Sequence, residues 1–599
     1  MTASPTGVTW DLTSYFPTFD GTEMREFKEK LAADIETLQK RATALGPLST
    51  ENAVDWEEVY LLAEDVGARL GHIFSYVGCL SSADASSDAY AAEEARLELL
   101  AAEYGKFGVD LLGALREADD DTFAAFTARE KLAPVAHSIR RDRERARKQM
   151  SAAEEKLAAD LGVNGVHAWG RLYDRISGKL AFEMRWPDGR VETLPISRWR
   201  SLMEDADREV GRAAFEGGNR AWQGVEDVCA ATLNAISGTR LTLYPRRGVE
   251  HFLDDPLFRA ATERETLEAM YRAIDENIEV AREIFRVKAG KLAREAIEWF
   301  ERDAPLPLPG SETLSWERGR DMVGRAFRTA YPALADYYEG FLLEKRWVES
   351  QARGGKRPGA FCTGSEVTGE QRVYMTFNGS LGDASTLAHE TGHAWHGHLL
   401  RQMRPMAREY PMTLAETASI FAEHVFADGV QADPEVPESG KLLMLDSELC
   451  SAATMILDIT VRFEFEKAFY EERAGGELPV SRFKELMVET QRRVFGDALL
   501  EGGEDPWFWA SKLHFHMSGL SFYNFPYTFG FLLARSLYAI FKAEGTGFLP
   551  RYEEFLRLAG SDTVEGVAKR TIGADVGDPE FWARALRSLS EPLERYRQA

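Results

Sequence analysis

The chain has 599 residues, of which 44% are hydrophobic and 28% charged, the usage of an ordinary folded protein, and this length predicts two or more lobes. Its formal net charge of −25 argues against nucleic-acid binding, which needs clustered Lys and Arg. The four cysteines form no Cys-x-x-Cys pair, no apolar run reaches about 18 residues and no signal-peptide pattern opens the chain. We therefore expect a cytoplasmic protein that does not associate with membranes.

The first part of the chain is predicted to be helical. From residue 23 to about 161, apolar residues recur at three-and-four spacing and prolines are few. Residues 179–195 then alternate around a Pro187-Asp-Gly189 turn, which predicts a small hairpin. We expect a lobe boundary near residue 200.

Helical periodicity resumes at residue 197 and continues to 302, where the proline-rich stretch 303–310 forbids a helix and predicts a rigid connector. Another helical stretch reaches about 349. The segments 353–362 and 372–378 are the extended region of the chain, and they predict two short strands before a helix. An edge strand there would suit either a bound peptide or a purely structural sheet. Beyond residue 400 helices are expected to the end.

The helix after these strands contains the pattern His389-Glu390-x-x-His393. Histidines four residues apart lie on one helix face, so both imidazoles can reach one metal ion. Glu390 is turned enough to face a water molecule at that ion. The pattern predicts a zinc hydrolase, with Glu390 as the general base of metal-assisted peptide hydrolysis.

A catalytic zinc needs a third protein ligand. The metzincin arrangement fails because the chain has His396 and Leu399 where that arrangement requires Gly and His. A glutamate from a second helix is the remaining common solution, and Glu416 is the best candidate. The alternative for Glu416 is a capping box with Thr413. Glu423, seven residues further on, suits either a hydrogen-bond acceptor for a ligand imidazole or a solvated position.

A last informative stretch, residues 507–530, is rich in His and Tyr. Peptide hydrolysis builds negative charge on the carbonyl oxygen, which Tyr O–H and His N–H groups can stabilise. The alternative is that this aromatic run forms core.

Together these segments resemble peptidase family M3, and within it the oligoendopeptidase F branch. The similarity covers about residues 200–590 by motif and the N-terminal helices more loosely. The matching segments are Gly354-Gly-Lys-Arg, Thr386-Leu-Ala-His389-Glu390-x-Gly-His393-Ala, Met412-Thr-Leu-Ala-Glu416-Thr-Ala-Ser, Lys512-Leu-His-Phe and Phe522-Tyr-Asn-Phe-Pro-Tyr527-Thr-Phe-Gly530.

The resemblance implies a mainly α fold: a two-lobed helical ellipsoid with a deep interlobe channel and a small β-sheet near the metal site. It implies an N-terminal helical lobe at 1–200 and a catalytic zinc metallopeptidase domain at 201–599. The implied zinc ligands, one ion per chain, are His389, His393 and Glu416, with Glu390 as base. The residues implied to line the site and stabilise the oxyanion are His514, Tyr523 and Tyr527.

One departure from the resemblance concerns His516, which stands where many relatives look to have Tyr, and we favour His514 as the residue facing substrate. The expected activity is a zinc-dependent oligoendopeptidase acting on internal bonds of short unstructured peptides. Alternatives are a dipeptidyl carboxypeptidase of the same fold and a catalytically silent peptide-binding scaffold. The sequence does not indicate side-chain preference or oligomeric state.

Overall fold

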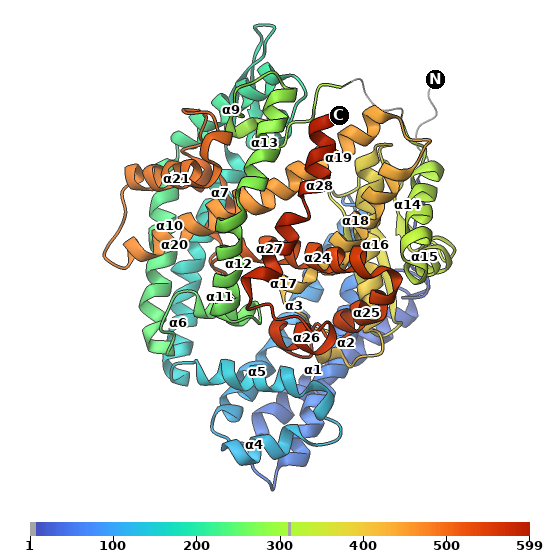
Figure 1. Cartoon of the computed structure of the whole chain (residues 1–599). Helices are drawn as coiled ribbons and strands as arrows, with labels where there is room; N and C mark the ends of the chain where they lie inside the picture. The colour runs from blue at the N-terminus through green and yellow to red at the C-terminus, as the bar shows by residue number, and fades with distance from the viewer. Residues whose placement is uncertain (1–6, 309–312) are drawn as a thin grey trace. The chain divides into compact units, whose positions relative to one another are not determined.

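The computed structural model describes residues 7–308 and 313–599, and helices dominate it (Figure 1). Its contacts divide the chain into two compact units, each built from three separate stretches. Unit 1 comprises residues 1–148, 312–435 and 540–574, and unit 2 comprises 149–311, 436–539 and 575–599. The boundary near residue 200 is not one of these divisions, and the independent lobe it implies stays a prediction.

Unit 1 begins with helices whose apolar faces form one continuous core that includes Trp56, Tyr60 and Phe126. These helices confirm the periodicity in the first part of the sequence. Its elements are α1 (Thr22–Ala44), α2 (Ala53–Ala83), α3 (Asp88–Arg116), α4 (Asp120–Thr127), α5 (Ala136–Arg147), α14 (Trp316–Ala330), α15 (Pro332–Tyr337), the π-helix η5 (Tyr338–Leu343), β3 (Val348–Glu349), β4 (Phe361–Ser365), β5 (Glu370–Tyr374), α16 (Leu381–Leu400), α17 (Met412–Ala415), α18 (Thr417–Ala432), α25 (Leu549–Arg557) and α26 (Val564–Thr571).

Unit 2 is also mainly helical, and a hairpin in it confirms the prediction for residues 179–195. β1 (Ala181–Arg185) pairs antiparallel with β2 (Val191–Pro195), and Gly189 in the turn has a φ of 86°. The helices are α6 (Ala152–Asn164), α7 (Val166–Lys179), α8 (Trp199–Met203), α9 (Arg208–Gln223), α10 (Glu226–Leu243), α11 (Asp254–Arg259), α12 (Arg264–Asn277), α13 (Glu279–Lys291), α19 (Glu438–Ala453), the π-helix η7 (Thr454–Asp458), α20 (Ile459–Arg473), α21 (Val480–Phe495), α22 (Phe508–Ser511), α23 (Leu513–His516), α27 (Pro579–Arg587) and α28 (Ser590–Gln598), while α24 (Phe525–Glu544) continues into unit 1.

Short 3-10 helices complete the described structure. They are η1 (Ala133–Val135), η2 (Ile196–Arg198), η3 (Pro245–Arg247), η4 (Trp299–Glu301), η6 (Pro405–Ala407), η8 (Gly496–Ala498) and η9 (Gly545–Phe548). Residues 304–308 of the predicted proline connector carry no regular structure, whereas 309 and 310 lie outside the described residues.

The sheet of unit 1 differs in its bounds from the sequence prediction. It has three strands in the order β3-β5-β4, with β4 antiparallel and β3 parallel to β5. The first predicted strand was placed too early, since β4 begins only at Phe361. Gly355 and Gly359, at φ values of 87° and 102°, turn the chain in the preceding segment and prevent an extended run. β5 leads through residues 375–380 into α16.

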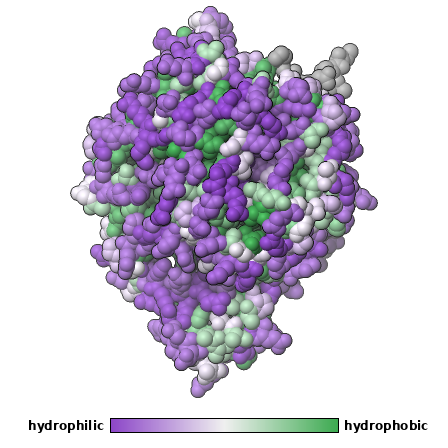
Figure 2. Space-filling view, in the orientation of Figure 1, coloured by the Kyte–Doolittle hydropathy of each residue, from purple (hydrophilic) through white to green (hydrophobic). Residues whose placement is uncertain are grey.

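The surface agrees with the charged composition. The face drawn in Figure 2 is covered mainly by hydrophilic residues, with apolar ones scattered among them. Within 7–308 and 313–599, none of the helices combines the length and the apolar character needed to cross a bilayer.

Candidate metal centre

Helix α16 places the two histidines of the His-Glu-x-x-His pattern side by side. A capping box at its start fixes the first turn, because the Asp383 backbone N–H donates to Ser380 Oγ at 3.0 Å and the Ser380 N–H donates to Asp383 at 2.9 Å. Two turns on, the Nε2 atoms of His389 and His393 are 3.2 Å apart. Both imidazoles are therefore in reach of a single ion.

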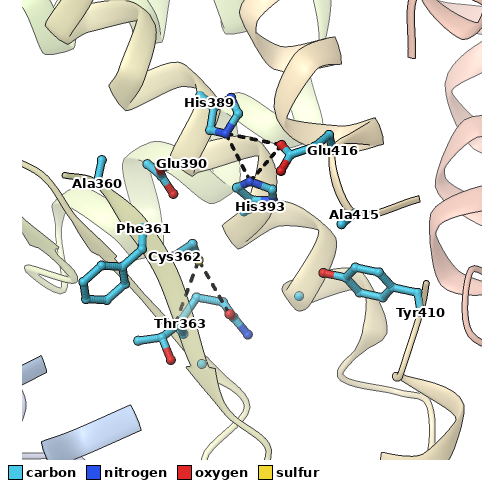
Figure 3. Close-up of a pocket in the computed structure, with 13 residues that line it drawn as sticks. Ala360, Phe361, Cys362, Thr363, His389, Glu390, His393, Tyr410, Ala415 and Glu416 are labelled. Carbon is cyan, nitrogen blue, oxygen red and sulfur yellow. Dashed lines mark hydrogen bonds and ion pairs between the residues drawn. The ribbon is translucent and has the colours of Figure 1, made fainter. Parts of the chain in front are cut away.

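Glu416 completes this group from the start of a second helix. Its Oε2 lies 3.4 Å from His389 Nε2 and 3.3 Å from His393 Nε2. Figure 3 shows the three side chains turned toward one another. Their ligand atoms all lie within 4.8 Å of one another, and within the described part of the chain this is the one such group of three found.

The competing capping-box interpretation of Glu416 is wrong. α17 is capped at Pro411 and α18 at Glu416, and neither helix has a side-chain cap hydrogen bond. The Glu416 carboxylate instead accepts a hydrogen bond from Ser419 Oγ at 2.7 Å while facing the imidazoles. Burial would raise the pKa of Glu416, but the hydrogen bond and charge of His393 and the charge of His389 outweigh it and lower the pKa to about 2. The carboxylate is thus ionised and able to bind a cation.

Close packing of the two helices sets this geometry. α16 packs against α18, and Gly392 lies at the contact. A Cβ atom on Gly392 would stand 2.4 Å from the carbonyl oxygen of Ala418 and 2.6 Å from Cα of Ser419. Only glycine allows the α18 backbone so close to the histidine face, which explains the Gly within the motif.

Glu423 lies two turns after Glu416 on α18 and orients His389. Its Oε1 lies 2.7 Å from His389 Nδ1, which confirms the acceptor interpretation made from the sequence. When a metal ion displaces the Nε2 proton, Nδ1 keeps its proton on Glu423 and the lone pair of Nε2 is available to bind the ion. Burial opposes the charged imidazole, but the hydrogen bond and charge of Glu423, with the charge of Glu416, raise the pKa of His389 to about 9.

We expect Glu423→Ala to weaken zinc binding by about 10- to 100-fold, because His389 loses the group that fixes its tautomer. Glu423→Gln, which keeps an acceptor and loses the charge, should give a smaller decrease. Competition with a chromogenic chelator measures both. Unchanged affinity in the Ala variant would make Glu423 an ordinary helix residue.

Glu390 lies beside the metal-ligand group, and one of its carboxylate oxygens accepts no hydrogen bond from the described residues. The side chain is 5% exposed, and its Oε2 has no hydrogen-bond partner among the described residues. Burial raises the pKa of this carboxyl group. An unpartnered buried oxygen next to two imidazoles and a carboxylate is costly unless a ligand or water completes it. The residues present therefore fit a catalytic metal, and two His with one Glu is a common donor set for zinc.

These side chains line a cavity of about 500 Å³. Its opposite wall is formed by β4 residues 361–364, Gln371 of β5 and Tyr410 from the loop before α17. Figure 3 shows the Tyr410 hydroxyl directed into this space and Glu390 on the side facing β4. Sequence reasoning missed Gln371 and Tyr410, because neither belongs to a motif; an aromatic residue six positions before a candidate ligand was the one available signal. The strand predicted to precede the helix does lie at the cavity.

A second group of side chains from the sequence analysis gathers in unit 2. The His514 ring centroid lies 5.0 Å from that of Tyr523 and 5.9 Å from that of Tyr527, and the two tyrosine rings are 5.7 Å apart. All three side chains are partly exposed, so the core interpretation of this stretch does not hold for them. They belong to a different unit from the metal-ligand group.

His516 is a core residue. It is 1% exposed, stacks on Tyr173 at a centroid distance of 3.8 Å, and its Nε2 lies 3.3 Å from the Trp509 carbonyl oxygen. Burial lowers its pKa to about 3. Of the two neighbouring histidines, His514 is the one with an exposed surface.

A helical fold in which a His-Glu-x-x-His helix meets a glutamate from the next helix defines a metallopeptidase. The comparisons with known proteins agree. A family model described as "Peptidase family M3" matches residues 331–588, and one described as "Oligopeptidase F" matches residues 115–182, so that together they span more than half of the chain. The chain belongs to peptidase family M3.

Individual relatives are distant in sequence and similar in length. Oligopeptidase PepF of Bacillus subtilis is 22% identical over 98% of this chain and 86% of its own length. The plasmid-encoded oligoendopeptidase F of Lactococcus lactis subsp. cremoris is 22% identical over 98% of this chain and 96% of its own.

Solved structures share the fold. A putative peptidase from Chlamydophila abortus superimposes with a TM-score of 0.83 at 18% identity, covering 98% of each chain. Oligoendopeptidase-F from Enterococcus faecium gives 0.70 at 18% identity over 96% of this chain and 98% of its own. These similarities confirm the mainly α fold class.

Proposed function

We propose that this chain is a zinc-dependent oligoendopeptidase that hydrolyses internal bonds of short unstructured peptides. The observation that carries the proposal is the convergence of His389, His393 and Glu416 beside the unpartnered carboxylate of Glu390 in one cavity. The names of the relatives, oligopeptidase and oligoendopeptidase, support the peptide substrate class.

His389, His393 and Glu416 would hold one zinc ion per chain. When bound, zinc supplies Lewis acidity that polarises the scissile carbonyl and acidifies a water molecule. Glu390 accepts a proton from the attacking water at its free oxygen and delivers it to the leaving amine nitrogen. Its burial suits this task, because a raised pKa helps a carboxylate to hold a proton between the two steps.

Strand β4 offers a place for the peptide backbone. In the described residues it pairs with β5 on one side only, and residues 361–364 face the same cavity as Glu390. An extended peptide added to the other side of β4 would run past the catalytic carboxylate. Hydrogen bonding through the main chain would hold an unstructured peptide whatever its side chains.

We also propose that His514, Tyr523 and Tyr527 act in the same reaction, with tyrosine hydroxyls as donors to the developing oxyanion. A channel between two lobes that admits short peptides belongs to the same proposal. The four free cysteines, three of them buried, support a reducing compartment such as the cytoplasm.

Product analysis on a peptide with an amidated C-terminus tests this function against a dipeptidyl carboxypeptidase of the same fold. An endopeptidase should cut the amidated and the free peptide at the same internal bonds and at similar rates. Mass spectrometry of the products reads this directly. Release of C-terminal dipeptides alone, abolished by the amide, would contradict the proposal, and tight peptide binding without cleavage would favour a silent scaffold.

A further inference from the structure

The hydrogen bonds of His514 constrain which of its nitrogens carries a proton. His514 Nδ1 lies 2.7 Å from Oδ1 of Asn524, a side chain that is 1% exposed. The same oxygen lies 3.3 Å from Nη1 of Arg462. One amide oxygen therefore faces both a guanidinium and an imidazole nitrogen.

Arg462 is held rigidly by a buried carboxylate. Its Nε and Nη2 lie 3.1 Å and 2.7 Å from the two oxygens of Asp458, a two-point contact that fixes the plane of the guanidinium. Asp458 ends the π-helix η7 and also lies 2.9 Å from Nη1 of Arg302. Burial would raise the pKa of Asp458, but Arg462 and Arg302 hold it below its usual range. The carboxylate stays charged, so Nη1 of Arg462 keeps its direction.

This arrangement determines the orientation of the Asn524 amide. A guanidinium can only donate, so the Asn524 atom next to it must be the oxygen; the reverse orientation would set two donors 3.3 Å apart. The oxygen then faces His514 Nδ1 as well. Since an amide oxygen only accepts, Nδ1 must donate, and it carries the proton. In the neutral imidazole Nε2 is consequently an unprotonated acceptor.

The charges around His514 favour this neutral form. Burial lowers its pKa; the Asn524 hydrogen bond works in the opposite direction, and the positive charges of Arg462, Lys512 and Arg200 lower it further. The other titratable groups against the ring are the phenols of Tyr523 and Tyr527. At neutral pH His514 is thus an uncharged imidazole.

We propose that His514 accepts, through Nε2, a hydrogen bond from a backbone N–H of the peptide substrate, and that Asn524 and Arg462 are positioning residues that fix this tautomer. The inference rests on the proposed function and refines it. His514 then holds the peptide instead of donating to the oxyanion, and Tyr523 and Tyr527 remain as the donors.

The local backbone supports a fixed His514–Asn524 geometry. Arg240 donates to the carbonyl oxygens of Met517 and Leu520, and Glu466 Oε1 accepts from the N–H of Phe522 at 2.9 Å. Hydrogen bonds from α10 and α20 therefore fix the chain between the histidine and the asparagine. They also hold Phe522 in a left-handed conformation, with a φ of 52°.

The direct test is the tautomer itself, read by nitrogen NMR on protein labelled with ¹⁵N-histidine, with His514→Gln to assign the signal. We expect a proton on Nδ1 and none on Nε2 near pH 7.5. Asn524→Leu should lose this preference and lower kcat/KM by about tenfold, the effect of one misplaced hydrogen bond. A wild-type enzyme that cleaves peptides but carries the proton on Nε2 overturns the inference and leaves the proposed function intact.

Asn524→Asp separates the acceptor role from a donor role. The carboxylate keeps the Nδ1 proton but stabilises the imidazolium, and the Arg462 guanidinium, whose Nη1 lies 3.3 Å from the oxygen of residue 524, compensates its charge. If Nε2 must accept a hydrogen bond, the acidic limb of the pH profile of kcat/KM should move up by about one pH unit, because the imidazolium has no acceptor. A limb that stays in place, or activity extending to lower pH, overturns the inference. Asn164→Asp, an exposed site in the same unit, is the control.

Substrates complete the test. The peptides form a series in which one backbone N–H away from the scissile bond is replaced by an ester oxygen. At one position the replacement should lower kcat/KM of the wild-type enzyme by about tenfold, and at that position it should not lower kcat/KM of His514→Phe any further. Additive losses at every position overturn the contact. A protein that cleaves no peptide in the series refutes the proposed function, whereas the NMR result still decides the tautomer.

Discussion

Glu390→Gln is expected to lower the rate of peptide hydrolysis by about 100- to 10,000-fold while leaving zinc content unchanged. The substitution keeps the size of the side chain, so the packing of α16 should be preserved. Glutamine cannot accept the proton of the attacking water. In Glu390 the oxygen available for that proton is Oε2, to which no described residue donates a hydrogen bond. The loss should appear in kcat, with the affinity for a peptide retained.

Steady-state cleavage of an internally quenched peptide and zinc analysis of the same preparation measure both parts. Glu438→Gln, at a side chain that is 90% exposed, is the matched control. A Glu390→Gln variant that cleaves near the wild-type rate would show that another group activates the water. Loss of zinc together with activity would instead make Glu390 a structural part of the cluster.

Glu416→Ala is expected to weaken zinc binding by more than about a hundredfold and to abolish cleavage. Two imidazoles would remain, and a catalytic zinc needs three protein ligands. The Glu416 carboxylate also lies 3.3 Å from His393 Nε2 and 3.4 Å from His389 Nε2. Its removal takes away a negative charge that would balance the two positive charges of a bound zinc ion.

Zinc content after dialysis against a weak chelator reads this effect, and circular dichroism checks that the helices persist. Glu435→Ala, an exposed glutamate of the same unit, should behave as wild type. Full zinc retention in the Glu416→Ala variant would transfer the third-ligand role to another residue.

The sequence singled out the three side chains that the structure brings together, because the reasoning behind them is local and chemical. Histidines at 389 and 393 must share a helix face, and a zinc site with two histidines demands a third ligand, which limited the choice to Glu416. Helical spacing left two interpretations of Glu423, an acceptor for a ligand imidazole or a solvated position, and its contact with His389 selects the first. By contrast, Thr413 and Glu416 satisfied a capping pattern that the structure does not use, since α17 starts after an extended Pro411, α18 starts at Thr417, and neither helix has a side-chain cap hydrogen bond.

Other features depend on contacts between distant segments and leave no pattern in the sequence. Tyr410 reaches the cavity from a loop, and Gln371 reaches it from a strand whose neighbour began later than predicted. Arg302 reaches Asp458 from a distant part of the chain, and Arg462 orients Asn524 across 62 positions. Periodicity describes single elements, whereas these positions are set by packing between elements.

Internal cleavage of peptides by this chain should depend on zinc bound beside Glu390. The most direct measurement is the zinc content of the purified protein together with cleavage of an internally quenched, C-terminally amidated peptide before chelation, after chelation and after zinc is restored. We expect one zinc per chain, with cleavage lost on chelation and recovered in proportion to the zinc bound. Full cleavage by metal-free protein, or none by the zinc-loaded protein, would contradict it.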